Sequence, residues 1–337
     1  MKAILPVAGV GSRLRPFTLT KPKALIPLVG RPIISYIIDS LIEIGVNEII
    51  FVIGYLGEEI KEYVKYEYNN RDFKPIFVFQ EERQGLAHAV YMAKEELKKE
   101  EDDIIIILGD TIIDTSLKKI IDSNFNGLGV KEVTNPHRFG IVEIDENDML
   151  IDLEEKPEHP KTNLALVGLY YFKSSFKLLE GLEYIINNDI KVRGEYQLTS
   201  VIEHLLKEGE AFKIYRVNDW IDCGDFDSLR EANNYFLNKL DSKYKIDEKN
   251  NTIYIPPYYV GEGSVIKNSI IGPFVSIGKG SVIEDSIIKN SIISENATIK
   301  RYLLNKSIIG EEAKLIGKHS SLNLSDHAQI VNGVNEV

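Results

Sequence analysis

The stretch KAILPVAGVGSRLRP at residues 2–16 runs from apolar residues through two glycines into a cationic loop. The apolar residues up to Ala8 predict a buried strand. Gly9 and Gly11 then let the backbone turn sharply and come close to a ligand. We therefore expect the chain to begin with a strand and a turn that can hold a ligand.

The residues after the glycines suit an anion with several oxygens, such as a phosphate group. Backbone N–H groups, the Ser12 hydroxyl, the Arg13 guanidinium and the Lys23 ammonium can all donate to such an anion. The loop is not a Walker A motif, because no Lys-Ser or Lys-Thr pair follows the second glycine. Leu14 stands where the Rossmann motif has its third glycine. A plain tight turn without a ligand is the alternative.

Further along, the chain alternates between helical and strand patterns. The patterns predict helices over 32–45, 57–68 and 86–99, and strands over 48–54, 75–80 and 104–108. The last of these strands is apolar without alternation, which is typical of a central parallel strand covered on both faces. The alternation predicts a doubly wound, Rossmann-like α/β sheet, in which ligands bind beyond the carboxyl ends of the strands.

Two polar residues, Gln80 and Asp110, directly follow predicted strands and so fall at that edge of the sheet. A carboxylate in this position suits a metal ion, although an aspartate that opens a loop is as often a simple turn or cap. The Gln80 amide offers a donor and an acceptor side by side, which suits the imide edge of uracil or thymine. Gly140 enters a later strand, where a glycine lets the backbone approach a ring. His88 lies on an apolar helix face, and we expect it to be packed rather than to bind a ligand.

Length and composition limit the class of protein. The chain has 337 residues, which favours two domains, and a formal net charge of −11. Residues 251–337 hold as many basic as acidic side chains, so the negative charge falls on residues 1–250 and argues against nucleic acid as a partner. The apolar runs are too short to cross a membrane. The single cysteine, Cys223, excludes an internal disulfide, and no signal peptide is visible, so we expect a cytoplasmic protein.

The segments AGVGSRL at 8–14 and KPK at 21–23 resemble the signature of the sugar-1-phosphate nucleotidylyltransferases, above all the glucose-1-phosphate thymidylyl- and uridylyltransferases. The thymidylyl enzymes usually have one more glycine in this loop and a threonine before the arginine. The shorter loop with Ser12 is more similar to the uridylyl branches, so the base stays open between uracil and thymine. The resemblance implies transfer of a nucleotidyl group from dTTP or UTP to a sugar 1-phosphate, glucose-1-phosphate by expectation, with release of pyrophosphate.

The same resemblance implies a nucleotide site and a Mg²⁺ site. The segment LGDT at 108–111 is similar to the family's Gly-Asp step, and WIDCG at 220–224 to its Trp-x-Asp-x-Gly, so Asp110 and Asp222 would bind the metal. The segment QEERQGLAHA at 80–89 resembles the part that reads the base. The implied nucleotide-binding residues are Ala8, Gly9, Gly11, Ser12, Arg13, Lys23, Gln80, Gly85 and Asp110, and the implied catalytic residues are Arg13, Lys23, Asp110 and Lys156.

On the sugar side, EKP at 155–157 matches the family's Glu-Lys-Pro, in which the glutamate binds sugar hydroxyls and the lysine the sugar phosphate. VGLYYF at 167–172 matches the strand that closes the sugar pocket. RGEYQLT at 193–199 resembles a segment near it that opens a helix with an acid in the first turn. The implied sugar-binding residues are Gly140, Glu155, Lys156, Gly168, Tyr170 and Glu195. Asp225, just past the metal motif, is expected to cap the helix that follows.

The C-terminal part repeats with a period of 17, in blocks at 266–282, 283–299 and 300–316. Isoleucine or valine recurs every five or six residues between small residues, which is the pattern of a parallel β-helix. It resembles the hexapeptide-repeat left-handed β-helix that many nucleotidylyltransferases carry. We expect a catalytic domain over 1–240, a linker over 241–251 and about three coils of β-helix over 252–330.

The β-helix is expected to be structural or to form a homo-oligomer, unless the catalytic domain does so. Acetyl transfer, which some relatives perform on such a helix, is disfavoured because it needs a longer array and a catalytic histidine. The candidates His319 and His327 lie at the ragged end. A guanylyltransferase that makes a GDP-sugar stays as an alternative. A catalytically silent subunit that binds sugar nucleotides is disfavoured, because such subunits tend to lose the charged site residues that this chain retains.

Overall fold

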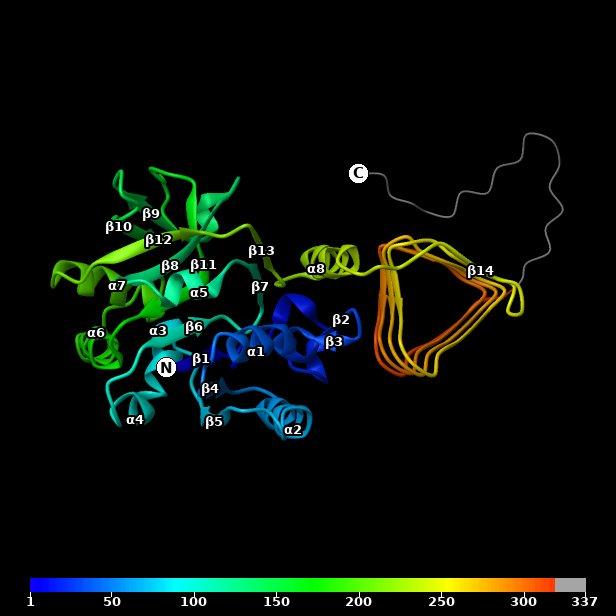
Figure 1. The fold of residues 1–337 in the computed structure, drawn as a ribbon, viewed down its shortest axis with the longest axis horizontal. Coiled ribbons are helices and arrows are strands. Elements are labelled where there is room, and N and C mark those ends of the chain that lie inside the picture. The colour runs from blue at the N-terminus through cyan, green and yellow to red at the C-terminus, as the bar shows by residue number, and fades with distance from the viewer. Residues whose placement is uncertain (319–337) are drawn as a thin grey trace. The chain divides into compact units, whose positions relative to one another are not determined.

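The computed structural model of the chain describes residues 1–318, so His319, His327 and the end of the expected β-helix lie outside the described residues. The chain divides into two compact units, Met1–Leu240 and the part from Asp241 onward (Figure 1). The first unit is a sheet with helices packed on it, and the second is a stack of short parallel strands.

A mixed nine-stranded sheet forms the centre of the first unit. The strands of this unit are β1 (Lys2–Pro6), β2 (Pro27–Leu28), β3 (Arg31–Pro32), β4 (Glu48–Ile53), β5 (Lys74–Phe79), β6 (Ile104–Ile107), β7 (Thr111–Asp114), β8 (Asn126–Glu132), β9 (Gly140–Ile144), β10 (Leu150–Glu155), β11 (Leu164–Phe172), β12 (Phe212–Arg216) and β13 (Asp219–Asp222). The sheet order is β10-β9-β11-β6-β1-β4-β5, with β8 paired to both β11 and β12. Strands β5, β4, β1 and β6 are parallel, and β11 is antiparallel to β6. The Rossmann-like core and its fully buried strand β6 are therefore confirmed.

Short helices connect and cover these strands. They are η1 (Ser12–Leu14), η2 (Phe17–Leu19), η3 (Lys23–Leu25), α1 (Ile33–Glu43), α2 (Gly57–Glu67), α3 (Leu86–Tyr91), α4 (Lys94–Leu97), α5 (Leu117–Ile121), η4 (Pro136–Arg138), α6 (Ser175–Asn187), α7 (Leu198–Lys207) and α8 (Phe226–Asn238). The single helix expected over 86–99 is wrong, because the Ala93 N–H bonds to Val90 O, three residues back, and the winding tightens between α3 and α4. Within the described residues, no helix is long and apolar enough to cross a membrane.

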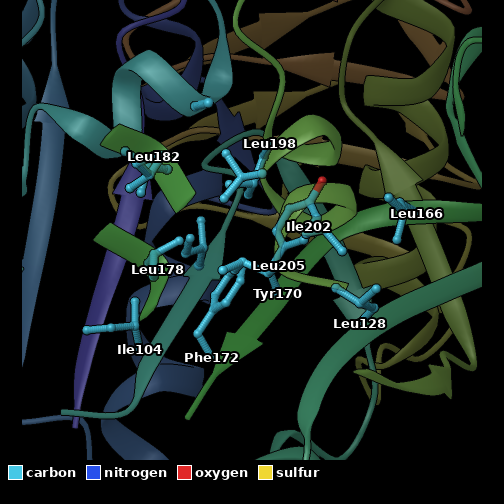
Figure 2. Packing of buried hydrophobic residues seen from close by; sticks show 14 of the residues in the cluster. Ile104, Leu128, Leu166, Tyr170, Phe172, Leu178, Leu182, Leu198, Ile202 and Leu205 are labelled. Atoms are coloured by element: carbon cyan, nitrogen blue, oxygen red, sulfur yellow. The ribbon is translucent and has the colours of Figure 1, made fainter. Parts of the chain in front are cut away.

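The apolar core lies on both faces of the sheet, because successive side chains of a strand point to opposite faces. Ile104 and Ile106 of β6 pack with α3, α6 and α7, whereas Ile105 and Ile107 pack with α1, α2 and α5. Figure 2 shows the first of these clusters, with Leu182 of α6 beside the side chains of α7. Each fully buried Leu or Ile side chain contributes roughly 1.5–3 kcal/mol. Because all four residues of β6 are apolar, this strand can be buried on both faces, between the two layers of helices.

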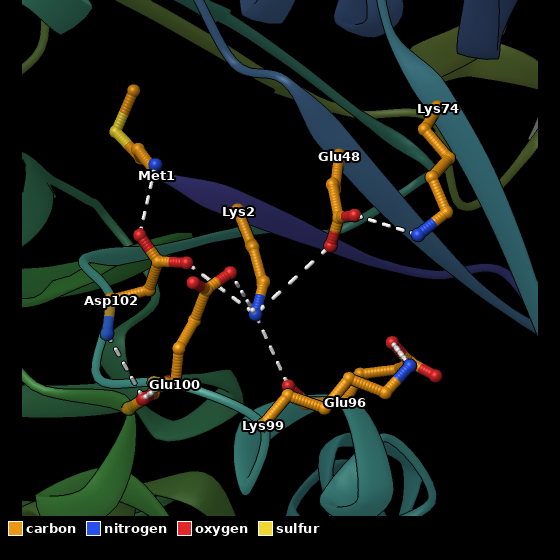
Figure 3. A network of polar contacts seen from close by, with 9 residues as sticks. Met1, Lys2, Glu48, Lys74, Glu96, Lys99, Glu100 and Asp102 are labelled. Carbon is orange, nitrogen blue, oxygen red and sulfur yellow. Dashed lines mark hydrogen bonds and ion pairs between the residues drawn. The ribbon is translucent and has the colours of Figure 1, made fainter.

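A buried cation joins the amino ends of the strands. Lys2 is 2% exposed, and its Nζ lies 3.4 Å from Asp102, 3.5 Å from Glu100 and 3.2 Å from the carbonyl oxygen of Glu96 (Figure 3). The N-terminal amine also pairs with Asp102, at 3.0 Å. These carboxylates reach solvent and so lower the cost of burying the ammonium. These ion pairs connect the amino ends of the strands. Ligands of such sheets bind at the opposite edge, beyond the carboxyl ends of the strands.

The second unit is the expected parallel β-helix. Its strands are β14 (Lys245–Asp247), β15 (Thr252–Tyr254), β16 (Tyr258–Val260), β17 (Val265–Lys267), β18 (Ile270–Ile271), β19 (Val275–Ile277), β20 (Val282–Glu284), β21 (Ile287–Lys289), β22 (Ser291–Ile293), β23 (Thr298–Lys300), β24 (Leu303–Asn305), β25 (Ile308–Ile309) and β26 (Lys314–Ile316). They form three sheets, β14-β15-β18-β21-β24, β16-β19-β22-β25 and β17-β20-β23-β26. Within the described residues each sheet stacks four parallel strands, one coil more than the sequence pattern indicated.

The period of 17 holds only for the first coils. Ile266 stacks on Ile283 in that period, but Ile283 stacks on Ile299, and Ile299 on Leu315, with a period of 16. The missing residue falls at one corner. Residues 272–274 connect β18 to β19, whereas a single residue, Asn290, lies between β21 and β22. The shorter corner keeps the aliphatic stack in register, because strand pairing and not sequence spacing sets the coil.

The expected linker over 241–251 also differs from the structure. It contains β14, whose Ile246 pairs antiparallel with Ile253 of β15. At the end of this segment, Asn251 is left-handed, with a φ of 48°, and its amide donates to the Asn268 side chain one coil further on, at 3.3 Å. Asparagine tolerates this conformation better than most residues. The aperiodic, polar composition therefore marks the first cap and corner of the β-helix and not a free connector.

Candidate active site

The loop after β1 folds back on Lys23. Gly11 is left-handed, with a φ of 63°, and the Thr18 hydroxyl donates to its carbonyl oxygen at 2.8 Å. A Cβ on Gly11 would lie 3.0 Å from Thr18 Cγ2 and 3.2 Å from Lys23 Cβ, so a side chain there would displace both. No atom lies within 4 Å of a Cβ built on Gly9. Ala8 is buried, so the loop is packed at Ala8 and open at Gly9.

The two predicted metal ligands come from distant parts of the chain. Asp222 ends β13, which pairs with β7, and the next backbone N–H, that of Cys223, donates to the Asp110 carbonyl oxygen at 3.0 Å. Lys23 Nζ lies 2.5 Å from Asp110 Oδ2 and 3.9 Å from Asp222 Oδ1. Burial, and then repulsion by Asp110, raises the pKa of Asp222, while Lys23 and Arg13 oppose the change. The charge of Asp222 is therefore stabilised by the neighbouring Lys23 and Arg13 cations.

The donor set fits a magnesium ion. Two carboxylates facing one space supply hard oxygen ligands, and Mg²⁺ in nucleotide enzymes is usually held by one or two carboxylates together with substrate phosphates. No cluster of three or more Asp, Glu, His or Cys side chains suited to a metal occurs in the described part of the chain. Asp110 and Asp222 alone would leave the remaining positions of such an ion to other oxygen ligands or water.

Arg13 reaches the same place from the first loop. A Cβ on Gly224 would lie 2.6 Å from Arg13 Nη2, so this glycine gives the guanidinium its room beside Asp222. Asp225 accepts a hydrogen bond from the Ser228 backbone N–H at 2.9 Å and caps α8, as expected. Ser12 and Arg13 are exposed, whereas Cys223 is buried. Burial raises the pKa of the Cys223 thiol, so it stays neutral.

One pocket of about 300 Å³ unites most of the predicted metal and sugar residues. The predicted residues in its lining are Arg13, Asp110, Gly140, Glu155, Gly168, Tyr170 and Asp222. A larger cavity of about 550 Å³ lies between α1, β7, α5 and α8, and the two linings have Thr111 in common. The smaller pocket is the candidate active site, because the charged groups of five separate segments converge on it.

Glu155 and Lys156 stand at the end of β10. Glu155 Oε2 accepts a hydrogen bond from the Thr199 hydroxyl at 3.2 Å, and Lys156 Nζ lies 3.5 Å from Glu155 Oε1. Lys156 is left-handed, with a φ of 48°, and its carbonyl oxygen accepts from Arg193 Nη2 at 2.8 Å. The turn thus places the Glu155 carboxylate in the pocket lining and the Lys156 ammonium beside that carboxylate, while Lys156 itself is outside the lining.

Gly168 and Tyr170 lie in β11, which forms the floor of the pocket. Gly168 has a φ of 79°, and a Cβ on it would meet Leu108 Cδ1 at 2.6 Å. Its carbonyl oxygen accepts the Leu108 N–H at 3.0 Å, so this glycine holds the segment that carries Asp110. Tyr170 is 5% exposed and packs in the core shown in Figure 2, and it is also among the residues that line the pocket. Burial raises the pKa of its phenol.

The predicted base-reading residues lie at the carboxyl end of β5. Gln80 is buried, and its backbone N–H donates to Ile53 O of β4 at 2.8 Å. Gly85 has a φ of 108°, and a Cβ there would lie 2.4 Å from the Tyr196 carbonyl oxygen. The glycine is therefore required where α3 begins against the segment before α7. His88 is partly buried and, beyond packing, lies within hydrogen-bond distance of Gln80.

The position expected for Glu195 is wrong. Helix α7 begins at Leu198 after the cap Gln197, so Glu195 lies before the helix and not in its first turn. Glu195 closes a tight turn by an isolated antiparallel β-bridge with Val192. The residue is exposed, and its carboxylate accepts a hydrogen bond from the Gln197 side-chain amide at 3.0 Å. The left-handed Gly194, with a φ of 83°, makes this turn and delays the helix.

The structure adds site residues that sequence reasoning missed. The pocket is also lined by Arg138, Phe139, Gln197, Thr199 and Trp220. Trp220 packs edge-on against Phe139, with ring centroids 5.0 Å apart, and its buried Nε1 has no hydrogen-bond partner among the described residues. Strand alternation could have found it, because Trp220 and Asp222 are two residues apart and so share one face of β13.

Comparison with known proteins shows the family to which the chain belongs. Residues 2–239 match the family described as nucleotidyl transferase, so the chain belongs to the nucleotidyl transferase family. Among its relatives is the bifunctional protein GlmU of Methanocaldococcus jannaschii, which is 36% identical over 79% of this chain and 61% of its own length. The glucose-1-phosphate thymidylyltransferase of Streptomyces griseus is 29% identical over 95% of this chain and 92% of its own length.

Solved structures agree with the fold. A UDP-glucose pyrophosphorylase from Acinetobacter baumannii is 26% identical, with a TM-score of 0.61 over 72% of this chain and 94% of its own. A UDP-glucose pyrophosphorylase whose structure was solved with UDP-glucose gives a TM-score of 0.62 at 22% identity. At this identity the likeness supports the fold and no further property. The chain spans about three fifths of the length of the GlmU relatives. The family expected from the loop after β1 is thereby confirmed.

Proposed function

We propose that this protein is a sugar-1-phosphate nucleotidylyltransferase that converts a nucleoside triphosphate and a sugar 1-phosphate into an NDP-sugar and pyrophosphate. The observation that carries this proposal is that the same pocket is lined by the metal and phosphate candidates and by the sugar candidates. These residues are Arg13, Asp110, Asp222, Gly140 and Glu155. Relatives named for glucose-1-phosphate and for UDP-glucose support glucose-1-phosphate as the sugar substrate. The nucleotide is dTTP or UTP.

Catalysis in such a site needs alignment and charge stabilisation. A sugar phosphate is already an anion at neutral pH, so no general base is required for its attack on the α-phosphorus. Lys156 would aim the attacking phosphate, Lys23 would bind the α-phosphoryl group, and Arg13 would hold the departing pyrophosphate. Lys23 is bound to Asp110 at 2.5 Å, so it keeps the carboxylate pair ordered until phosphate oxygens compete for its ammonium.

Asp110 and Asp222 would hold a Mg²⁺ ion, because their carboxylates both lie beside the Lys23 ammonium and line one pocket, where they offer hard oxygen ligands. The ion, when bound, supplies positive charge that screens the phosphate oxygens. Gln80 would read the imide edge of the base, and Glu155 would accept hydrogen bonds from sugar hydroxyls while Thr199 holds its carboxylate.

The test replaces the carboxylates. Asp110→Asn and Asp222→Asn each remove one charge without changing size, and we expect pyrophosphate release to fall by about 10²–10³-fold. Circular dichroism should show both variants folded. A control, Asp148→Asn, removes a surface carboxylate that pairs with Arg216 and should keep normal turnover. Near-normal rates in both site variants would refute the metal assignment.

A substrate panel decides between the remaining functions. UTP, dTTP, CTP, GTP and ATP are each combined with glucose-1-phosphate and with mannose-1-phosphate, and pyrophosphate is measured. We expect release with UTP or dTTP and glucose-1-phosphate. A preference for GTP with mannose-1-phosphate would instead show a guanylyltransferase. No release from any pair would favour a silent sugar-nucleotide-binding subunit and contradict the proposal.

The β-helix offers a surface for the proposed homo-oligomer. Ile253, Ile270, Ile287 and Leu303 stack in register on the outer face of one sheet, because their neighbours in sequence are buried inside. Ile246 extends this row. The outer face of the sheet formed by β17, β20, β23 and β26 is instead mixed, with the Glu284–Lys300 pair at 2.7 Å as well as the exposed Val265. We expect the apolar row to contact a second copy of the chain.

Light scattering tests this contact. Ile287→Lys places a charge in the row and should lower the molar mass of the assembly. Val265→Lys is the matched control, because Val265 is 43% exposed and Ile287 42%, but Val265 lies on the other sheet. An unchanged mass in Ile287→Lys would show that the row does not form the oligomer, and would leave the catalytic domain as the remaining route.

A further inference from the structure

Gln80, which is buried, and His88, which is partly buried, form a pair at the carboxyl end of β5. Gln80 is 4% exposed and is anchored through its backbone N–H to Ile53 O. Its side-chain Nε2 lies 3.0 Å from Nδ1 of His88, which belongs to α3. The contact spans a loop of exposed and half-buried residues that includes Gly85. A buried amide held at one end by a ring nitrogen is not free to turn as a surface glutamine is.

His88 is suited to accept a hydrogen bond from this amide. Burial lowers its pKa, and the charge of Glu82 only partly opposes the change. The ring is therefore neutral near pH 7, and a neutral imidazole has one nitrogen that accepts. The Tyr196 ring is a neighbour of the imidazole, with ring centroids 6.4 Å apart and planes at 25°. With the ring proton on Nε2, Nδ1 accepts an N–H of Gln80.

We infer that His88 is a positioning residue that fixes the orientation of the Gln80 amide and so selects uracil or thymine over cytosine. The inference rests on the proposed function, in which Gln80 reads the base. The side-chain amide has two N–H groups and one carbonyl oxygen. When the N–H that points away from the oxygen is given to His88, the oxygen and the second N–H remain side by side for the base.

That arrangement matches an imide. The N3–H of uracil or thymine donates to Gln80 Oε1, and the base oxygen at position 4 accepts the free N–H. Cytosine has the opposite pattern, with an acceptor at N3 and an amino group at position 4. To pair with cytosine, the Gln80 amide must rotate by half a turn. Rotation brings Oε1 against the lone pair of His88 Nδ1, unless the imidazole proton moves to the other nitrogen, and either change costs binding energy only for cytosine.

The experiment measures dissociation constants of UTP, dTTP and CTP for the full chain by calorimetry. His88→Leu keeps the apolar packing and removes the acceptor. His88→Asp replaces the ring by a group that can only accept, so it should hold the amide in the same orientation. The ratio of CTP to UTP constants is the readout, because general damage to the site weakens both nucleotides and cancels.

We expect the wild-type protein to favour UTP over CTP, His88→Leu to reduce this ratio by about tenfold, and His88→Asp to preserve it within about threefold. An unchanged ratio in His88→Leu, or equal binding of UTP and CTP by the wild type, would overturn the inference. The turnover panel tests the proposed function separately. Selective UTP binding that depends on His88, without pyrophosphate release, would refute the catalytic proposal and still support the role of His88.

Discussion

The replacement Gly140→Ala tests the sugar side of the site directly. Gly140 begins β9 opposite Glu155 of β10. An added Cβ would lie 2.9 Å from Thr199 Cγ2 and 3.1 Å from both Glu155 Oε2 and Leu166 Cδ1. Ordinary contacts to a methyl group begin near 3.4 Å. The new methyl group must therefore push the Glu155 carboxylate and Thr199 apart, although the Thr199 hydroxyl donates to that carboxylate.

The size of the effect follows from this overlap. The shortfall of 0.3–0.5 Å has to be absorbed by side chains that line the pocket, at a stability cost of about 1–3 kcal/mol for overpacking. A misplacement of 1 Å can cost about 100-fold in rate, so about half of that shift should lower kcat/KM for glucose-1-phosphate by about tenfold. Binding of the nucleoside triphosphate should not change, because Glu155 is on the sugar side.

The assay is pyrophosphate release at varied glucose-1-phosphate and saturating UTP or dTTP, with calorimetry of the nucleotide alone. Gly127→Ala is the matched control. Its Cβ would meet Ile120 Cγ2 of α5 at 2.7 Å, a slightly larger overlap than at Gly140, but between β8 and α5. The control should lose stability but not substrate affinity. An unchanged kcat/KM for the sugar phosphate in Gly140→Ala, or a loss confined to nucleotide binding, would refute the placement of Glu155.

Two further predictions concern stability. Lys2→Met keeps the buried volume but removes the ammonium that Glu100 and Asp102 share, so that Asp102 is left with the N-terminal amine. Urea denaturation should show a loss of about 1–3 kcal/mol with normal turnover, and an unchanged midpoint would contradict this expectation. The Ser228 N–H bond holds the pKa of Asp225 below its usual value, so the charged cap stabilises the protein above the unfolded-state pKa and this contribution fades as pH falls through the folded-state pKa. Asp225→Asn should therefore be about 0.5 kcal/mol less stable than the wild type at pH 7, and the gap should close on acidification, whereas a constant gap would speak against the charge.

Much of the site could be predicted because its parts lie in short, continuous segments. Glu155 and Lys156 are consecutive in the chain, and Gly11 and Lys23 belong to the same short stretch of it. The chain therefore limits how far apart the members of each pair can lie. Asp110 follows directly from the apolar run of β6, since a strand delivers the next residue to its carboxyl end. The helix break after Tyr91 and the late start of α7 could not be predicted in this way, because each depends on a tight local turn that packing selects.

The sequence by itself determined the strand periodicity, the turn at Gly9 and Gly11, the family, and the β-helix, because these depend on residues close together in the chain. Only the tertiary structure decided which distant groups meet. The pairing of β13 with β7 brings Asp222 beside Asp110, and with it Trp220 into the pocket. The tertiary structure also determined the shorter period of the later β-helix coils and brought His88 within hydrogen-bond distance of Gln80. Long-range contacts of this kind depend on strand order and register, which no local pattern contains.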